Sequence, residues 1–515
     1  MPLSHPPLLS PETPASASGA AAWTSRKFIR DVVFANLPGP FQRLRAYIWL
    51  IVFSYCMGMA AVGAWALFDM TLSLSIAAAT LLLGHAMMRF LSGARSREET
   101  NAGFSSVLGM VVVSSLAVGV GLVLLAGPLT RGIFHGGDGR NLLFIAAAVL
   151  VFDCVYEETR GFLRARRENR DWAVVTLGRV LPETVVTVVV AMVTRSIVAT
   201  ALAYLVCAAL ASVGAVLFVR RAAGVRLVMP DPRVLKRYLS FSLPLMPGTM
   251  GLVAGARLDR YIIAYFLSLR EVGIYSICFA MAGLVPALVA PIGDVLFPEL
   301  ADLYETSRWD AFYGRFAGVQ KFILAAAVGG TALLVAFPRE ALRLVTPVAY
   351  TEGASMLALL GIRGVFMVAL TFYGMLVNLR LKVWCWTTIY VSMGVAVVAL
   401  DLLLVPWAGL YGAAISQLVT TAIGAVAVIG IEWETCRRSF APDWLIPIGI
   451  AFGAVYLLAW FRPPGELTVA HSVLRLFFGG TVYIAALALT GYVRREDLQP
   501  FRDALWAGER TQSDT

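Results

Sequence analysis

Fourteen apolar stretches, each close to the length that crosses a lipid bilayer, fill most of this chain between Ala46 and Tyr492. A spanning helix needs roughly 20 mostly apolar residues, because it must cross about 30 Å of hydrocarbon while satisfying its own backbone hydrogen bonds. We place the spans at 46–66, 70–90, 105–127, 141–160, 171–194, 197–219, 238–268, 272–297, 317–337, 353–379, 384–404, 409–431, 443–461 and 472–492. The sequence therefore predicts an all-α polytopic membrane protein.

The composition agrees with a lipid environment. Of the 515 residues, 59% are hydrophobic and only 14% are charged, which is more apolar surface than one or two soluble cores could bury. The net charge is +10. When basic residues near the span ends are counted with the joints, 30 of the 42 lie on the N-terminal side of the predicted membrane, 8 on the other side and four deep inside spans. By the positive-inside rule both termini are cytoplasmic, so the charge indicates topology rather than nucleic-acid binding.

The most polar interior joint runs from Arg220 to Arg237 and contains Pro230 and Pro232, which are helix breakers. A weak internal sequence repeat suggests two repeated six-helix bundles. Trp172 precedes Leu205 by 33 residues, and Trp386 precedes Leu418 by 32. We predict a cytoplasmic tail that can form an interfacial helix (1–45), an N-terminal six-helix lobe (46–219), a basic linker (220–237), a C-terminal six-helix lobe (238–431), two appended helices (432–492) and a cytoplasmic tail (493–515).

Motifs of catalysis are missing from the sequence. It has no phosphate-cradling GxxxxGK[ST] loop, HExxH zinc helix or GxSxG nucleophile turn, and its four histidines and six cysteines are dispersed. No joint is much longer than about 20 residues, whereas membrane polysaccharide polymerases usually carry a long outer loop with catalytic residues. We therefore expect a transporter without a metal or other cofactor, and we keep a membrane glycosyltransferase or polymerase as the weaker alternative.

Four arginines lie well inside the predicted spans, away from their ends, where each charge costs roughly 2.5–3.5 kcal/mol unless it is paired or hydrated. Arg257 and Arg260 lie three residues apart on one side of the seventh span, with Asp259 between them in sequence. We expect that side to face a water-filled cavity. Guanidinium groups suit a cargo with phosphate, because they bind phosphate oxygens in a bidentate manner and keep their charge when partly desolvated.

The other two intramembrane arginines allow two readings. Arg179 shares its predicted depth with Asp153 on the neighbouring span and has Glu183 at i+4, so a structural ion pair is as reasonable as substrate contact. Arg363 has no acidic residue in its own helix and either lines the cavity or pairs elsewhere. The carboxylates Asp259, Glu183 and Asp153 are candidates for coupling to H⁺ or Na⁺, which keeps a cation-coupled drug or metabolite exporter open as an alternative.

The stretch RLDRYIIAYFLSLREVGIYSICFAMAGLVPALVAPIGDVLFPEL, from Arg257 to Leu300, carries an Asp, an apolar run, a Val-Gly-x-Tyr turn and a terminal Pro. It resembles the same region of Wzx-type polysaccharide flippases in the multidrug/oligosaccharidyl-lipid/polysaccharide (MOP) exporter superfamily. The matching residues are Asp259, Val272, Gly273, Tyr275 and Pro298. Two shorter segments, RGFLRARRENRDWA after the fourth span and GLYGAAISQLV at the twelfth, are similar as well.

The resemblance implies a two-lobed transporter of the bacterial inner membrane that flips an undecaprenyl-pyrophosphate-linked oligosaccharide for surface or exported polysaccharide. It implies alternating access driven by an ion gradient, with polysaccharide polymerase and export machinery as further partners. One departure is that the first span, 46–66, lacks the basic residues that related peptidoglycan-precursor flippases place in their cavity there. This lowers the expectation of a peptidoglycan precursor as the cargo.

Overall fold

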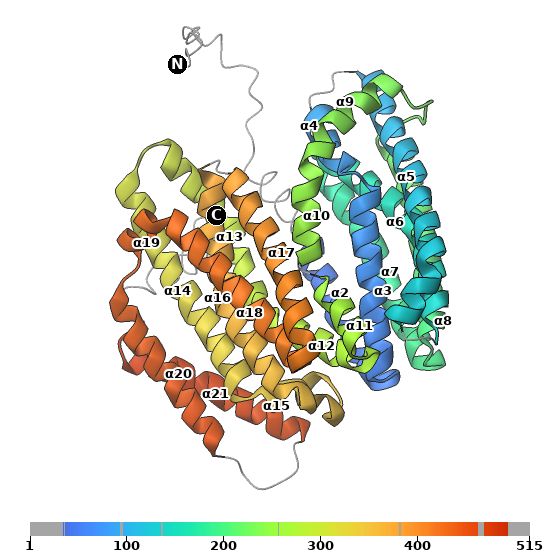
Figure 1. Ribbon diagram of the computed structural model, residues 1–515. Coiled ribbons are helices and arrows are strands. Elements are labelled where there is room, and N and C mark those ends of the chain that lie inside the picture. The colour runs from blue at the N-terminus through green and yellow to red at the C-terminus, as the bar shows by residue number, and fades with distance from the viewer. Residues whose placement is uncertain are drawn as a thin grey trace, which may run out of the picture.

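The computed structural model describes residue 34 and residues 37–492, except 93–95, 135–136, 256, 381–382 and 462–467. All regular elements in this part of the chain are helices, and eleven of them are long and apolar enough to cross a membrane. The prediction of an all-α polytopic membrane protein is thus confirmed. Figure 1 shows two helix bundles side by side. The predicted C-terminal tail and most of the predicted N-terminal tail lie outside the described residues.

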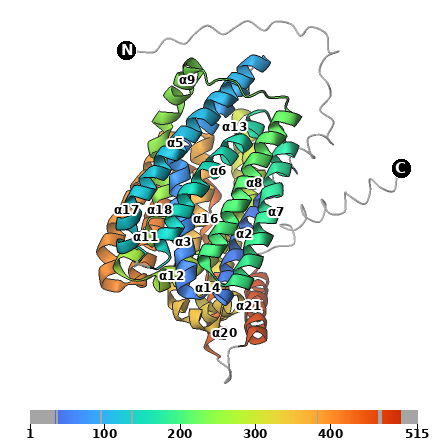
Figure 2. The ribbon, with the colours of Figure 1, turned by 90° about the vertical axis from the view of Figure 1, so that its right-hand side faces the viewer.

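The N-terminal bundle contains the first half of the helices and is seen from its outer side in Figure 2. Its members are α2 (Pro38–Cys56), α3 (Met59–Ala79), α4 (Leu83–Leu91), α5 (Arg97–Gly132), α6 (Gly139–Ala165), α7 (Asn169–Thr194) and α8 (Ile197–Ala222). Helix α6 packs against α5 and α8, while α7 packs against α8 and α2. A buried aromatic cluster of Trp49, Phe53, Trp65 and Tyr204 joins α2, α3 and α8, with edge-to-face ring contacts of 5.0–6.1 Å.

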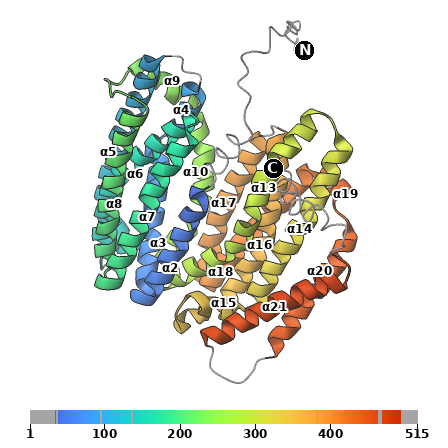
Figure 3. The ribbon, with the colours of Figure 1, turned by 180° about the vertical axis from the view of Figure 1, so that it is seen from behind.

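The C-terminal bundle comprises α10 (Met246–Gly255), α11 (Asp259–Phe266), α12 (Leu269–Ala282), α13 (Leu284–Glu305), α14 (Trp309–Ala336), α15 (Pro338–Val345), η2 (Val348–Gly353), α16 (Ala354–Leu379), α17 (Val383–Ala408) and α18 (Leu410–Ile431). Helix α16 packs against α14 and α18, and α10 packs against α17. After α19 (Trp433–Ser439) and η3 (Pro442–Trp444), the chain ends in α20 (Leu445–Trp460) and α21 (Val469–Leu489). These two lie against α14 and α15 at the edge of the molecule (Figure 3).

The first two predicted spans are placed wrongly along the chain. The helix break falls at Met57–Gly58, inside the predicted span 46–66, and α3 runs through the predicted joint at 67–69. Gly58 has a φ of +82°, a conformation that glycine adopts without steric cost. A second break follows at Leu81 and Leu82, with φ values of 51° and 55°. Both turns consist of apolar or small residues, so hydropathy does not reveal them.

The seventh predicted span, 238–268, is not one helix. It is divided among α9 (Pro232–Ser242), η1 (Leu243–Leu245), α10 and α11. Pro244 and Pro247 lie where the pieces join, and proline removes a backbone donor and disfavours helix continuation. Helix α9 begins inside the predicted linker and packs on the N-terminal bundle, where Tyr238 stacks on Phe90 with ring centroids 5.2 Å apart.

The two bundles contact each other where α3 crosses α12. A Cβ atom added to Gly63 would lie 1.9 Å from the carbonyl oxygen of Leu269, and one added to Gly273 would lie 2.0 Å from that of Met59. Only glycine at both positions allows the two backbones to come this close. Thr71 and Tyr261 add a hydroxyl–hydroxyl hydrogen bond of 2.6 Å between α3 and α11.

Candidate functional site

A cavity of about 350 Å³ lies between the two bundles, next to this crossing. Its walls come from α2, α3, α11 and α12 and from the turn that leads into α11. Seven charged or aromatic side chains line it: Arg45, Trp49, Trp65, Asp69, Arg257, Arg260 and Phe279. The cavity therefore brings arginines from both halves of the chain to one place.

Arg260 and Arg363 flank the ring of Phe279 from α12. Their guanidinium carbons lie 4.7 Å and 4.8 Å from the ring centroid, within the range of cation–π attraction. Arg363 Nε donates to the Thr421 hydroxyl at 3.1 Å, and among the described residues Arg363 forms no salt bridge. This part of the site consequently holds a guanidinium group whose charge is not neutralised by a bonded carboxylate.

Arg257 connects the two bundles. Its guanidinium donates to Asp69 Oδ2 of α3 at 3.2 Å and to the Ser73 hydroxyl at 2.7 Å. The side chains of Arg257 and Asp69 are 40% and 57% exposed, so water screens this pair and it contributes little to stability. An anionic ligand can therefore replace Asp69 as the partner of Arg257 at small cost.

Asp259 is fully buried at the start of α11 and accepts hydrogen bonds from three neighbours. Tyr275 donates at 2.6 Å, Gln417 of α18 at 3.1 Å, and Arg260 donates through its backbone amide at 2.8 Å and its guanidinium at 3.0 Å. Asp401 of α17 is buried close enough to Asp259 to interact with it electrostatically. Asp401 forms no salt bridge in the described part of the chain, and its carboxyl group interacts with the Ser416 hydroxyl of α18.

Arg179 does not line the cavity between the bundles. Its guanidinium bonds to Asp153 Oδ1 at 2.6 Å and to Glu183 Oε2 at 2.7 Å, and the three side chains are almost entirely buried. Tyr204 donates to the other oxygen of Asp153 at 3.0 Å. Of the two readings that the sequence left open, the geometry corresponds to the structural ion pair.

Arg45 is a cavity residue that the sequence analysis missed, because it was counted as part of the tail before the first span. Helix α2 in fact begins at Pro38, and Arg45 faces the cavity with its guanidinium 4.6 Å from the Trp49 ring. It also forms a salt bridge with Glu183, which joins the cavity to the buried Arg179 cluster. The predicted span 46–66 contains no basic residue, but the first helix begins before it and supplies Arg45 to the cavity. The spacing of Arg45 and Trp49 by one helical turn was the available signal.

The fold and this cavity are those of a polytopic membrane protein built from two helix bundles. Residues 94–337, slightly less than half of the chain, match a family model described as polysaccharide biosynthesis protein. This match agrees with the resemblance to polysaccharide biosynthesis proteins, and the structural likenesses given next show the fold of MOP superfamily transporters. No curated protein matches the chain.

Several solved structures share the fold. The lipid II flippase MurJ, in an inward closed conformation, has a TM-score of 0.68 at 11% identity, with 91% of this chain and 99% of that chain covered. An inward-facing multidrug resistance MATE family transporter of the MOP superfamily has a TM-score of 0.60 at 18% identity, covering 79% and 98%. A MOP superfamily transporter from Pyrococcus furiosus has a TM-score of 0.55 at 14% identity, covering 80% and 96%. These proteins are a flippase and transporters, and at these identities the likeness shows a shared fold.

Proposed function

We propose that the protein flips an undecaprenyl-pyrophosphate-linked oligosaccharide across the bacterial inner membrane for the assembly of surface or exported polysaccharide. The observation that carries this proposal is the arrangement of Arg260 and Arg363 around Phe279, beside a cavity that Arg45 and Arg257 also enter. The family match supports the pathway, and the two-bundle fold supports alternating access.

The chemistry of the cavity suits a diphosphate. A guanidinium group presents planar, paired N–H donors that match phosphate oxygens, and its charge persists when it is partly desolvated. Arg363 has no carboxylate bonded to it in the described structure, and the partner of Arg257 is half exposed. Phosphate oxygens can thus replace water or a weak partner at these arginines without breaking a buried ion pair. We assign Arg257, Arg260, Arg363 and Arg45 to substrate binding.

Arg179 supports the substrate-binding arginines indirectly. Because Glu183 accepts bonds from both Arg179 and Arg45, the buried cluster orients the Arg45 guanidinium toward the cavity. Asp153 and Tyr204 hold Arg179 in turn. We assign Asp153, Arg179 and Glu183 to this supporting role rather than to ion coupling.

We further propose that an H⁺ or Na⁺ gradient drives the cycle through Asp259 and Asp401. Two carboxyl groups buried near each other in the membrane are costly when both are ionised, and binding of a cation relieves this cost. Asp259 is bonded to Arg260, so a change of charge at the carboxyl pair reaches the substrate cavity directly. The charge distribution supports a topology with both termini in the cytoplasm, and polymerase and export proteins are the expected partners downstream.

The first test is deletion of the gene in its host. Radiolabelled sugar and leaflet-specific protection would measure where the lipid-linked oligosaccharide resides. Accumulation on the cytoplasmic face, reversed by the wild-type gene and not by Arg260→Ala or Arg363→Ala, is the expected result. Normal arrival of the glycolipid at the outer leaflet would overturn the proposal.

A cation-coupled exporter of drugs or metabolites is the second candidate, and the buried Asp401 beside Asp259, which forms no salt bridge within the described residues, favours it. Transport by such an exporter would require the carboxyl groups of Asp259 and Asp401 and not the cavity arginines. Retained export by Arg260→Ala and Arg363→Ala, together with lost export by Asp259→Asn, would select this alternative.

A further inference from the structure

A second cavity opens in the C-terminal bundle, further along the line of α12 and α13. Its volume is about 330 Å³, and it lies between α13, α16 and α17. Phe279 of the arginine cavity and Pro286 at the edge of the second cavity are separated by seven residues, which is about 10 Å along a helical path. Figure 3 shows α17 on the side of its bundle that faces α10, with α13 next to it.

The lining combines aromatic rings with two polar side chains. Phe297, Phe372 and Trp386 supply the rings, and Thr371 and Asn378 supply a hydroxyl and an amide. Thr371 and Asn378 are exposed, and Asn378 forms no side-chain hydrogen bond within the described residues. Small-molecule sites typically have this make-up, with mostly apolar walls and a few polar groups that orient the ligand.

The Trp386 ring is held in one position by its neighbours. A Cβ atom on Gly374 would lie 2.0 Å from Cζ3 of the indole, so the ring rests directly on the backbone of α16. Tyr390, one turn further along α17, contacts it edge-on with ring centroids 4.5 Å apart. The indole is thereby fixed as a rigid platform at the cavity wall, and a platform that is already ordered loses little entropy when a ligand stacks on it.

We propose that this second cavity is a carbohydrate subsite, an inference that rests on the proposed flippase function. The apolar face of a sugar ring stacks on Trp386, and its hydroxyl groups bond to the amide of Asn378 and the hydroxyl of Thr371. With the diphosphate at the arginines, a separation of about 10 Å places the glycan, rather than the phosphates, in this cavity. Gly374 is a positioning residue, because any side chain there would displace the indole.

The test uses the full chain in nanodiscs and two probes. One probe is the polyprenyl-diphosphate glycolipid extracted from the deletion strain of the host, and the other is undecaprenyl diphosphate without sugar. The wild type should bind the glycolipid more tightly than the bare lipid. Trp386→Leu and Asn378→Ala should each weaken glycolipid binding by about five- to tenfold, the effect of one lost stacking or hydrogen-bonding contact, and leave the bare lipid unaffected.

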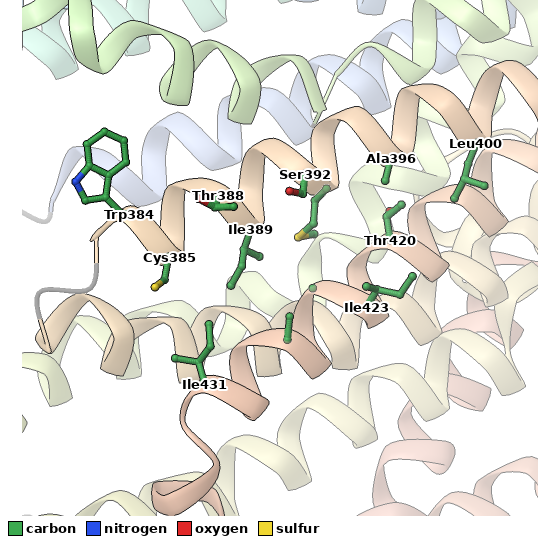
Figure 4. A pocket seen from close by; sticks show the side chains of 13 residues that line it. Trp384, Cys385, Thr388, Ile389, Ser392, Ala396, Leu400, Thr420, Ile423 and Ile431 are labelled. Atoms are coloured by element: carbon green, nitrogen blue, oxygen red, sulfur yellow. The ribbon is translucent and has the colours of Figure 1, made fainter.

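Trp384→Leu is the matched control. Trp384 is two residues earlier on the same helix and 84% exposed, and it borders a different, apolar cavity between α17 and α18 (Figure 4). Its substitution should change neither affinity. Equal losses for both probes, or wild-type glycolipid affinity in both Trp386→Leu and Asn378→Ala, would overturn the carbohydrate subsite. Failure of the wild type to bind either probe more tightly than Arg363→Ala would instead overturn the flippase function itself.

Discussion

Arg45 forms a salt bridge with Glu183, and this contact joins the first helix and the cavity to a buried charge cluster. Glu183 keeps a second partner, Arg179, at 2.7 Å. The bond therefore orients Arg45 without making the cluster depend on it. Arg45, which the hydropathy pattern assigns to the polar N-terminal tail, is in this way part of the proposed substrate site.

Arg45→Ala should lower flipping by at least about tenfold, because a phosphate contact of a charged donor is lost. The amount of folded protein should stay close to that of the wild type, since Arg179 still neutralises Glu183. Transport in proteoliposomes and the yield of monodisperse protein would measure both effects. Arg43→Ala, an exposed site on the same helix, is the control and should transport normally. Normal transport by Arg45→Ala would remove it from the site.

Arg179→Ala should act on stability. It leaves Asp153 and Glu183 buried without their shared guanidinium, and breaking a buried ion pair costs about 3–5 kcal/mol. The yield of protein extracted from the membrane and its thermal unfolding temperature should both decrease. Arg179→Met combined with Asp153→Asn should recover part of the loss. A stable Arg179→Ala protein that does not transport would assign Arg179 to the substrate instead.

Hydropathy was sufficient for the class of fold, because membrane helices must be long, apolar and internally hydrogen-bonded. Equal depth in a hairpin also indicated the partner of Arg179, and the structure places Asp153 2.6 Å from it. What the sequence could not supply are contacts between distant helices. Thr421 lies 58 residues from Arg363, and no periodicity in either helix relates the two.

Breaks in spans were a separate source of error. A hydropathy window marks the residue at which the sequence becomes apolar, not the residue at which the helix begins. Helix α2 begins several residues before its apolar part, at Pro38. Arg45 lies in that polar first part and was consequently assigned to the tail. Asp69 was assigned to a joint for a related reason, since the true turn at Gly58 is too short and too apolar to interrupt the pattern.

Gly63→Val should separate the bundles at their crossing. The added Cβ would lie 1.9 Å from a backbone oxygen, which cannot move aside as a flexible side chain can. The cross-linking yield of a Thr71→Cys and Tyr261→Cys pair, joined by a bis-maleimide reagent that spans the space of the Tyr261 ring, should fall several-fold, and flipping should stop. Gly121→Val is the control, because a Cβ there meets nothing within 4 Å. Unchanged cross-linking and transport would show that the crossing does not control access.

Asp401→Asn should uncouple transport from the ion gradient. The substitution removes one of two neighbouring buried carboxyl groups, so a cation no longer relieves their repulsion, and the folded amount should not decrease. Flipping in proteoliposomes would be measured with and without an imposed Na⁺ or pH gradient. The wild type should be stimulated by one of the gradients and the variant by neither, while Asp443→Asn at an exposed site should behave as the wild type. Full stimulation of Asp401→Asn would exclude this carboxyl from coupling.

Arg260→Ala and Arg363→Ala should each reduce export by at least about tenfold while folded protein accumulates normally. Arg363→Lys separates charge from shape, because lysine keeps the positive charge but lacks the planar fork that stacks on Phe279 and binds two phosphate oxygens. It should retain more activity than Arg363→Ala and less than the wild type. Export of labelled glycolipid in the complemented deletion strain measures this series. If Arg260→Ala and Arg363→Ala both export as the wild type does, phosphate is not bound beside the Phe279 ring. The neighbouring pair of carboxyl groups then becomes the better candidate for the site that binds the transported species.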